Sequence, residues 1–379
     1  MGEVCQLNPR ADNVSDDASV SFVGMADLDA TAGLTLRCNM RRFGEVRRGY
    51  TTFRDGDILI AKITPCFENN KIGQARLQTP VGAGSTEFHV LRPQETLFDR
   101  YALHFLRQQR IRSQGELRMT GSAGQRRIPA NYLSALTIPL PPLDEQRRIA
   151  AILDKADSLR MKYQQISTAL AQVCSSIYIH MFGHPLHNPR GYLTVPLDQV
   201  GTLERGVSKH RPRNDPALLD GPYPLIQTGD VTRSGGYITK HCSTYSDLGL
   251  AQSKLWPAGT LCITIAANIA QTGILTFPAC FPDSVVGFSA DEATTLFVRT
   301  WFTFLQSTLE ASAPQSAQRN INLEILRRLP VPLPSIHGRR GFADAQKSIQ
   351  SQIEVVSRAA AFHDELFASL QSRAFQGEL

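Results

Sequence analysis

A proline-rich segment that turns into a charged helix occurs twice in this chain, and this repeat constrains the fold more than any other feature. The first copy, IPLPPLDEQRRIAAILDKAD, covers Ile138–Asp157, and a degraded copy, VPLPSIHGRRGFADAQKSI, covers Val331–Ile349. The two copies start 193 residues apart, and the same separation places Phe182 on Phe375. Self-similarity at a long, fixed separation indicates duplicated structural units.

The duplication extends toward the N-terminus at a slightly different separation. At 203 residues, SFVGMADLD (Ser21–Asp29) lies over PLIQTGDVT (Pro224–Thr232), and FRDGDILIA (Phe53–Ala61) lies over WPAGTLCIT (Trp256–Thr264). Short apolar or β-branched runs that follow glycine are typical of strands after turns. The chain is therefore predicted to be a tandem duplication, each copy an α/β module followed by a long helix.

The first long helix is predicted from Leu143, because Pro142 suits a first helical turn, to a stop at Gly183. Roughly forty residues at ~1.5 Å each make a rod of about 60 Å. Apolar residues alternate at spacings of three and four, which is the pattern of a coiled-coil seam. The seam consists of Ile149, Ile152, Ala156, Leu159, Tyr163, Ile166, Leu170, Val173 and Ile177.

The second helix is predicted from about Phe342 to Phe375, with His363 as a polar register or rim residue beside its apolar stripe. Its best partner is the seam of the first helix, so antiparallel packing and a pseudo-two-fold axis are expected. Residues 184–203 have no counterpart before the first module. We therefore expect the C-terminal tail SRAFQGEL (Ser372–Leu379) to complete the missing edge of module one.

These observations predict an α/β (α+β) fold, with two pseudo-two-fold-related globular domains separated by an antiparallel coiled coil of two long helices. The predicted division is 1–142 for the first domain, 143–183 for the first helix, 184–335 for the second domain, and 336–379 for the second helix and tail.

Composition favours a soluble globular protein in the cytoplasm. Hydrophobic residues make up 42% and charged residues 20%, with a net charge of +6 and a pI near 9.0, so an anionic partner is compatible but not required. Seven cysteines without a CxxC pair favour reduced thiols. The longest apolar run, Leu261–Phe277, contains Asn268 and Gln271, and predicts buried strands joined by a turn instead of a membrane span.

Motifs for catalysis are not found in the sequence. No phosphate-binding GxxxxGK[ST] loop occurs, and no adenine methyltransferase loop of the [DN]PP[FY] type. A histidine group at His180, His184 and His187 straddles the predicted helix stop, which favours a hydrogen-bonding linker over a metal site. Two similar non-catalytic modules held apart by a rod make a ruler, and if each module touches DNA, the rod sets the spacing between two half-sites.

Three segments carry a family resemblance. IPLPPLDEQRRIAAILDKADSL, MFGHP after the first helix, and LFASLQSRAFQGEL at the end resemble the conserved regions of specificity subunits of type I restriction–modification systems. The resemblance covers essentially the whole chain. The second copy departs from the motif, because His337, Gly338 and Arg339 stand in place of the acidic first turn; this concerns the helix cap and not the architecture.

The resemblance implies two target-recognition domains, each reading one half of a bipartite, asymmetric site in double-stranded DNA. It also implies that the helices set the spacing and dock two modification subunits, which bind S-adenosylmethionine and methylate adenine at N6. Restriction subunits would add ATP- and Mg²⁺-dependent translocation and cleavage. The chain itself would hold no cofactor, no metal and no catalytic residue. The open alternatives are a coiled-coil adapter that binds no DNA, and the specificity part of a fused restriction–methylation enzyme.

Candidate DNA-binding residues follow from residue type, because arginine and lysine suit phosphates while Asn, Gln, Arg, Ser and Thr suit base edges. A plain surface role is the alternative for each. The first module offers Arg41, Arg42, Arg47, Arg48, Lys62, Asn69, Asn70, Lys71, Gln125 and Arg126. The second offers Lys209, Arg211, Arg213, Gln227, Thr228, Asn268, Gln271, Gln318 and Arg319.

Overall fold

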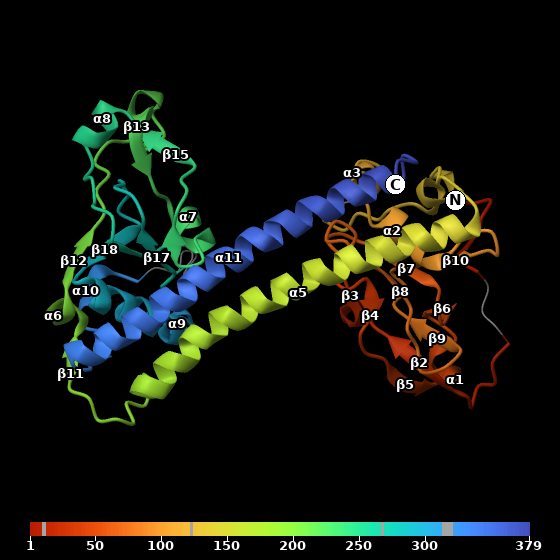
Figure 1. Ribbon diagram of the computed structural model, residues 1–379, viewed down its shortest axis with the longest axis horizontal. Coiled ribbons are helices and arrows are strands. Elements are labelled where there is room, and N and C mark those ends of the chain that lie inside the picture. The colour runs from red at the N-terminus through yellow and green to blue at the C-terminus, as the bar shows by residue number, and fades with distance from the viewer. Residues whose placement is uncertain (10–12, 122–123, 267–268, 313–320) are drawn as a thin grey trace. The chain divides into compact units, whose positions relative to one another are not determined.

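The computed structural model describes residues 1–379 apart from 10–12, 122–123, 267–268 and 313–320 (Figure 1). The chain forms two compact units. Unit 1 comprises residues 1–166 and 356–379, and unit 2 comprises residues 167–355. Each long helix therefore contributes one part to each unit. Within the described residues, no helix is long and apolar enough to cross a membrane.

Unit 1 is built on two sheets. The larger has the strand order β1 (Cys5–Leu7), β10 (Phe88–Pro93), β7 (Ile58–Ala61), β8 (Ile72–Gln74), β4 (Leu34–Thr35) and β3 (Leu28–Asp29). The smaller has the order β5 (Asn39–Arg42), β2 (Ser19–Val23), β9 (Val81–Gly84) and β6 (Thr51–Arg54). The short helices are η1 (Met25–Asp27), α1 (Phe43–Val46), α2 (Asp99–Leu106), α3 (Gln109–Glu116) and α4 (Ala130–Ala135).

Unit 2 has one sheet of five strands and two ribbons. The sheet order is β12 (Thr202–Arg205), β18 (Val285–Ser289), β16 (Leu261–Thr264), β17 (Thr272–Leu275) and β14 (Tyr237–Ile238). The ribbons pair β13 (Leu219–Leu225) with β15 (Ser243–Tyr245), and β11 (Thr194–Pro196) with β19 (Pro330–Pro332). The helices are α6 (Leu197–Val200), η2 (Pro216–Leu218), α7 (Thr228–Arg233), α8 (Asp247–Ala251), α9 (Glu292–Ser312) and α10 (Leu323–Arg327).

The two larger sheets share one topology, which confirms the duplication and the mixed fold class. The order β1-β10-β7-β8-β4 corresponds to β12-β18-β16-β17-β14, and the corresponding pairs β8–β4 and β17–β14 are both parallel. Strands β7 and β16 stand 203 residues apart, as predicted. Gly56 and Gly259 lie in the turns just before these two strands, and their φ angles of +87° and +86° are ones that glycine adopts without strain. The apolar run Leu261–Phe277 contains β16 and β17, as predicted.

The long helices are α5 (Leu143–Phe182) and α11 (Ile336–Ala374). Helix α5 ends where Gly183 turns to a φ of +79°, which agrees with the predicted stop. Helix α11 starts earlier than the stripe around Phe342 suggested. The Ser335 hydroxyl accepts a hydrogen bond from the Gly338 amide at 3.2 Å and so caps the helix without acidic residues.

Antiparallel packing of the two helices is visible within unit 1. The ring of Tyr163 stacks on His363 with a centroid distance of 4.6 Å, and the Arg160 guanidinium lies 4.7 Å from the Phe367 ring centroid. Contacts thus advance along α11 as they retreat along α5. The seam is correct at Ile149, which is 4% exposed. It also holds at Ala156, which is 9% exposed, and at Tyr163, which contacts α11, but it fails at Ile166 and Val173.

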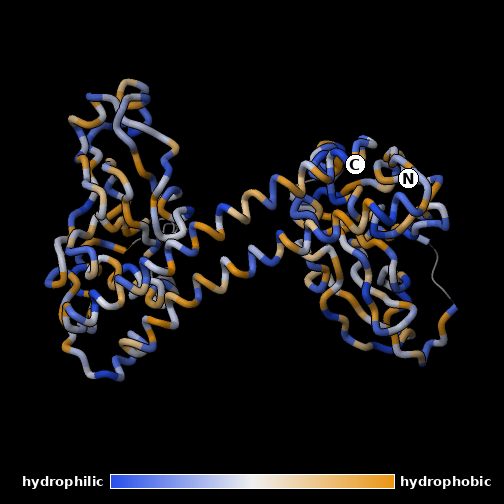
Figure 2. The backbone as a smooth tube through the Cα atoms, in the orientation of Figure 1, coloured by the Kyte–Doolittle hydropathy of each residue, from blue (hydrophilic) through white to orange (hydrophobic). Residues whose placement is uncertain are grey.

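Some predicted seam residues are exposed, while some residues outside the seam are buried. Ile166 and Val173 are 45% and 40% exposed, whereas Leu153 and Tyr178, which lie outside the predicted seam, are 0% and 1% exposed. Figure 2 shows polar and apolar residues alternating along both helices. A heptad count assumes that a helix packs against one surface, whereas each of these helices packs against the other long helix and also against the modules.

The C-terminal tail packs in unit 1, in a form different from the prediction. Phe375 is 8% exposed, with ring centroids 4.9 Å from Tyr101 and 5.3 Å from Phe105. The Gln371 side chain also donates to the His104 carbonyl at 2.9 Å. The tail is helix and turn, so it supplies core side chains and not a sheet edge. In unit 2, the extra stretch supplies β11, which pairs with the second proline segment in β19.

Candidate nucleic-acid interface

One loop junction is built in the same way in both units. In unit 1, the Lys62 amide donates to the Glu87 carbonyl at 2.7 Å, and the Ile128 amide donates to the Lys62 carbonyl at 2.9 Å. In unit 2, the Ile265 amide donates to the Ser284 carbonyl at 3.0 Å, and the Ile321 amide donates to the Ile265 carbonyl at 3.0 Å. Three segments therefore meet at the end of β7 or β16: the strand end, the turn before β10 or β18, and the stretch before α4 or α10.

We call the charged side chains at these junctions the strand-end clusters. They comprise Lys62, Glu68, Glu87, Arg126 and Arg127 in unit 1, and Arg205, Arg211, Arg213 and Asp283 in unit 2. The frameworks match while the side chains differ.

In unit 1, the Arg127 guanidinium donates hydrogen bonds to the Glu87 carboxylate, from Nε to Oε2 at 3.0 Å and from Nη2 to Oε1 at 2.7 Å. These bonds lower the pKa of the Glu87 carboxyl below its ordinary value. Arg126 lies 3.2 Å from Glu68, and Lys62 donates to the Thr86 carbonyl at 2.7 Å. Partial burial lowers the pKa of the Lys62 ammonium, a shift that Glu87 opposes.

In unit 2, three arginines meet at one residue, Asp283, two at its carboxylate and one at its main-chain carbonyl. Asp283 forms an ion pair with Arg213, lies 3.5 Å from Arg211, and accepts a bond at its main-chain carbonyl from the Arg205 side chain. A cleft of about 510 Å³ opens beside this group. The positive charge at this place exceeds the negative charge, so an anionic polymer is favoured.

The remaining candidates of unit 1 lie mainly on a different sheet. Arg41 and Arg42 are on the exposed strand β5, where the Arg41 guanidinium lies 3.8 Å over the Phe22 ring. Arg48 is exposed, and Arg47 pairs with Asp16 at 2.8 Å.

Among the residues that follow β7, Asn69 is exposed and Asn70 has a φ of +57°. The Lys71 ammonium donates to the Met25 carbonyl at 2.7 Å, which engages it within the module. The structure therefore joins Lys62 and Gln125–Arg126, since the Thr64 amide donates to the Arg126 carbonyl at 3.0 Å. It leaves the β5 arginines on the smaller sheet.

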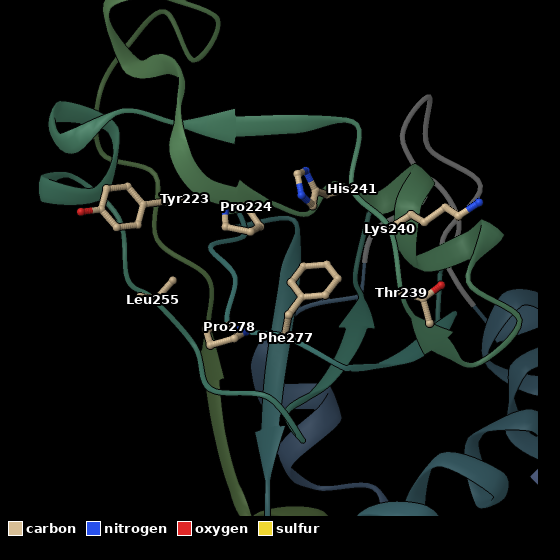
Figure 3. A pocket seen from close by; sticks show the side chains of 8 residues that line it. All are labelled: Tyr223, Pro224, Thr239, Lys240, His241, Leu255, Phe277 and Pro278. Carbon is tan, nitrogen blue, oxygen red and sulfur yellow. The ribbon is translucent and has the colours of Figure 1, made fainter.

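Unit 2 has a second concave surface on its β13–β15 ribbon (Figure 3). The cleft measures about 650 Å³ and combines aromatic, apolar and basic side chains. The His241 ring lies 5.6 Å from Phe277, and the Tyr223 hydroxyl donates to Asp247 at 3.0 Å. Its lining is Tyr223, Pro224, Thr239, Lys240, His241, Leu255, Phe277 and Pro278.

Gln227 lies near the same ribbon, because its side-chain amide donates to the Ser243 hydroxyl at 3.4 Å. Thr228 follows it as the first residue of α7. The Lys209 main chain bonds to the Gln252 side chain at 2.6 Å, and the Gln271 amide donates to the Thr264 hydroxyl at 3.1 Å. The candidates Asn268, Gln318 and Arg319 lie outside the described residues.

Several residues at these surfaces were missed by sequence reasoning. Arg127 directly follows the candidate Arg126 and could have been added by charge alone. Arg205 belongs to the same basic stretch of the sequence as the candidates Lys209, Arg211 and Arg213, whereas Lys240 and His241 carried no distinguishing pattern. The described residues contain no group of three or more His, Cys, Asp or Glu side chains suited to hold a metal ion. His184 instead packs its ring 5.6 Å from Phe304.

Comparison with known proteins places this geometry in context. The profile of a family described as "Type I restriction modification DNA specificity domain" matches residues 1–170 and 189–369. The type I restriction enzyme EcoEI specificity subunit of Escherichia coli is 40% identical over 157 residues, 41% of this chain and 26% of that protein. The EcoAI specificity subunit of the same species is 37% identical over 166 residues, 43% and 28% of the two chains. These alignments span about a quarter of the relatives' length.

Two solved structures share the fold. A chain from a type I R-M system studied for complex assembly and conformational transition aligns with a TM-score of 0.56 at 19% identity, covering 100% of this chain and 97% of the other. A type I restriction–modification S subunit from M. genitalium aligns with a TM-score of 0.57 at 13% identity, covering 99% and 94%.

Proposed function

Because the chain belongs to the family of type I restriction–modification DNA specificity proteins, we propose that it selects the DNA sequence on which a modification and restriction complex acts. The observation that carries this proposal is the pair of strand-end clusters. One main-chain framework occurs twice, and it presents different charged side chains in each unit. Two related readers of different specificity account for a bipartite, asymmetric site in double-stranded DNA.

The chain supplies specificity and assembly, and no catalysis. Two modification subunits dock on the long helices and carry S-adenosylmethionine for adenine-N6 methylation, while restriction subunits contribute ATP- and Mg²⁺-dependent translocation and cleavage. Exposed apolar side chains on both helices suit such docking, since large apolar residues in water favour burial in an interface. They include Ile166, Val173 and Ile179 on α5, and Val355, Phe362 and Leu366 on α11. The complex works in the cytoplasm, where the chromosome lies.

The test is methylation-sensitive sequencing of DNA from a methylation-free host that expresses this chain with its modification subunit. Two short specific blocks split by a fixed gap, with adenine marked, are expected. Exchange of residues 1–130 for another module should change one block only. An assembled complex that marks no adenine would overturn the proposal in favour of the coiled-coil adapter, which predicts no salt-dependent DNA binding.

A further inference from the structure

One carboxylate of each strand-end cluster, Glu87 in unit 1 and Asp283 in unit 2, occupies a neighbouring position of the same turn. Strand register pairs Leu91 with Ile58 in unit 1 and Phe288 with Leu261 in unit 2, which makes Leu91 and Phe288 equivalent. Counting back from them, Glu87 and Asp283 lie one position apart in the turn before β10 or β18. Each module thus places an acidic side chain at the same end of its sheet.

The arginines that meet these carboxylates come from unrelated segments. Arg127 lies in the stretch before α4, whereas Arg213 lies in the loop after β12. The duplicate of Arg127 is Asn320, which is uncharged and falls outside the described residues. Duplication therefore did not deliver the second arginine. The same ion pair arises twice at one place from different parts of the chain, and this indicates a requirement of the site itself.

The pairs leave much of each guanidinium free to bind. A guanidinium has five N–H donors. Glu87 engages Nε and Nη2 of Arg127, so the edge formed by Nη1 and Nη2 keeps open donors, with only a long contact of 3.4 Å from Nη1 to the Gln125 carbonyl. The bond to Asp283 engages only Nη2 of Arg213. The Arg127 and Arg213 side chains are 46% and 47% exposed.

Such pairs contribute little to folding, because solvent screens exposed ion pairs. They do fix the direction of the guanidinium before a ligand arrives, which reduces the ordering cost of binding. A fork of parallel donors with no acceptor fits a base edge with two acceptors, and guanine presents N7 and O6 in this way in the major groove.

We propose that Arg127 and Arg213 each read one guanine, the first in the half-site of unit 1 and the second in that of unit 2. Glu87 and Asp283 are the positioning residues that orient the two guanidinium groups. This inference rests on the proposed function and deepens it. It assigns the two guanine readers by the same rule in both modules, although their sequences offer no aligned arginine pair.

The experiment measures base preference at every position of the site by sequencing methylated DNA from a randomised library. Arg127→Gln should reduce the preference for guanine at one position of one half-site by about 10- to 100-fold, and leave the other half-site unchanged. Arg213→Gln should do the same in the opposite half-site. Arg328→Gln is the matched control, because Arg328 forms a similar exposed pair with Glu324 at 2.8 Å.

Arg127→Lys and Glu87→Gln separate base reading from other roles. Glu87 orients the guanidinium, so Glu87→Gln should lower the guanine preference at the same position as Arg127→Gln, and an unchanged preference would overturn its positioning role. Lysine keeps the charge but loses the fork, so guanine preference should fall while overall DNA affinity persists. Uniform weakening in Arg127→Gln with an unchanged base preference would overturn the inference, because it indicates a phosphate contact. An unchanged motif in both arginine variants would also overturn it. Failure of the wild-type complex to mark any bipartite site would instead overturn the proposed function.

Discussion

Replacement of Phe375 by alanine tests whether the C-terminal tail closes the first module. Phe375 follows α11 and is 8% exposed, against Tyr101 and Phe105 of α2. Its duplicate, Phe182, ends α5 and is 5% exposed, with ring centroids 5.2 Å from Phe297 and 5.6 Å from Phe342. The two residues occupy equivalent positions, one in each unit, so each substitution serves as the control for the other.

The expected loss follows from burial. An aromatic side chain buries roughly 150–250 Å², worth about 25 cal/mol per Å², and alanine recovers only part of it. Phenylalanine-to-alanine changes in cores cost about 3–5 kcal/mol. Phe375 keeps 8% exposure and sits beside a turn that can partly collapse, so we expect about 3 kcal/mol from the free energy of unfolding of unit 1. Phe362→Ala on the same helix, at 61% exposure, should cost about 0.5 kcal/mol or less.

Hydrogen exchange followed by mass spectrometry resolves the effect by unit, because local opening energies are read peptide by peptide. Phe375→Ala should lower protection in α2 and the first sheet, and Phe182→Ala should lower it in α9 and the second sheet. Equal loss of protection in both units, or a loss below about 1 kcal/mol in unit 1, would refute the argument that the tail completes that core.

Two further predictions concern charged groups in unit 1. Burial alone would raise the pKa of Asp154, but hydrogen bonds from His104 and Arg100 lower it from 3.8 to about 2. The stability that the ionised carboxylate contributes is therefore full above about pH 5 and is lost as the pH falls toward 2. Asp154→Asn should lower the free energy of unfolding by about 1 kcal/mol at pH 7, because the carboxylate is 38% exposed and screened, and should flatten the acid side of a denaturation series measured against pH. Arg92→Ser leaves the Asp57 carboxylate, 3% exposed, without its guanidinium partner at 2.7 Å and should cost about 3–5 kcal/mol in chemical denaturation. Unit 2 carries Ser289 and Thr260 at the equivalent positions, so the double variant Arg92→Ser with Asp57→Thr should recover most of that loss.

The parts of the fold visible in the sequence are those with local or periodic signals. Proline and glycine mark the limits of α5, and the constant separation of 203 residues brings β7 onto β16. Glycine-led apolar runs predicted both central strands. Each of these signals depends on the conformational limits of a few residues, so one sequence is sufficient to detect it.

The parts that escaped prediction depend on contacts between distant residues. Arg127 lies 40 residues from Glu87, and Arg213 lies 70 from Asp283, so neither pair has a local pattern. The exposure of Ile166 and the burial of Leu153 depend on which surfaces cover the helix, and a heptad count cannot supply this. The apolar stripe alone placed the start of α11 near Phe342, six residues after its first residue, because the Ser335 cap stands where the first copy has Pro142 and adds no apolar signal.

The duplication poses a problem of assignment, because two similar modules must each pack on the correct segments of two similar helices. At one contact, side chains of opposite charge distinguish the correct packing from the exchanged one. In unit 1, Asp154 of α5 pairs with Arg100 in the first turn of α2 and with His104 in its last turn. In unit 2, the duplicate of Asp154 is Lys347 of α11, which pairs with Glu292 at the start of α9 at 2.7 Å. An exchanged arrangement would set Asp154 against Glu292 and Lys347 against Arg100, and both contacts would be repulsive. These two ion pairs therefore contribute more to the choice of the correct packing than to the stability of the fold. An exposed ion pair adds little to the free energy of unfolding, whereas a contact between like charges destabilises the exchanged packing.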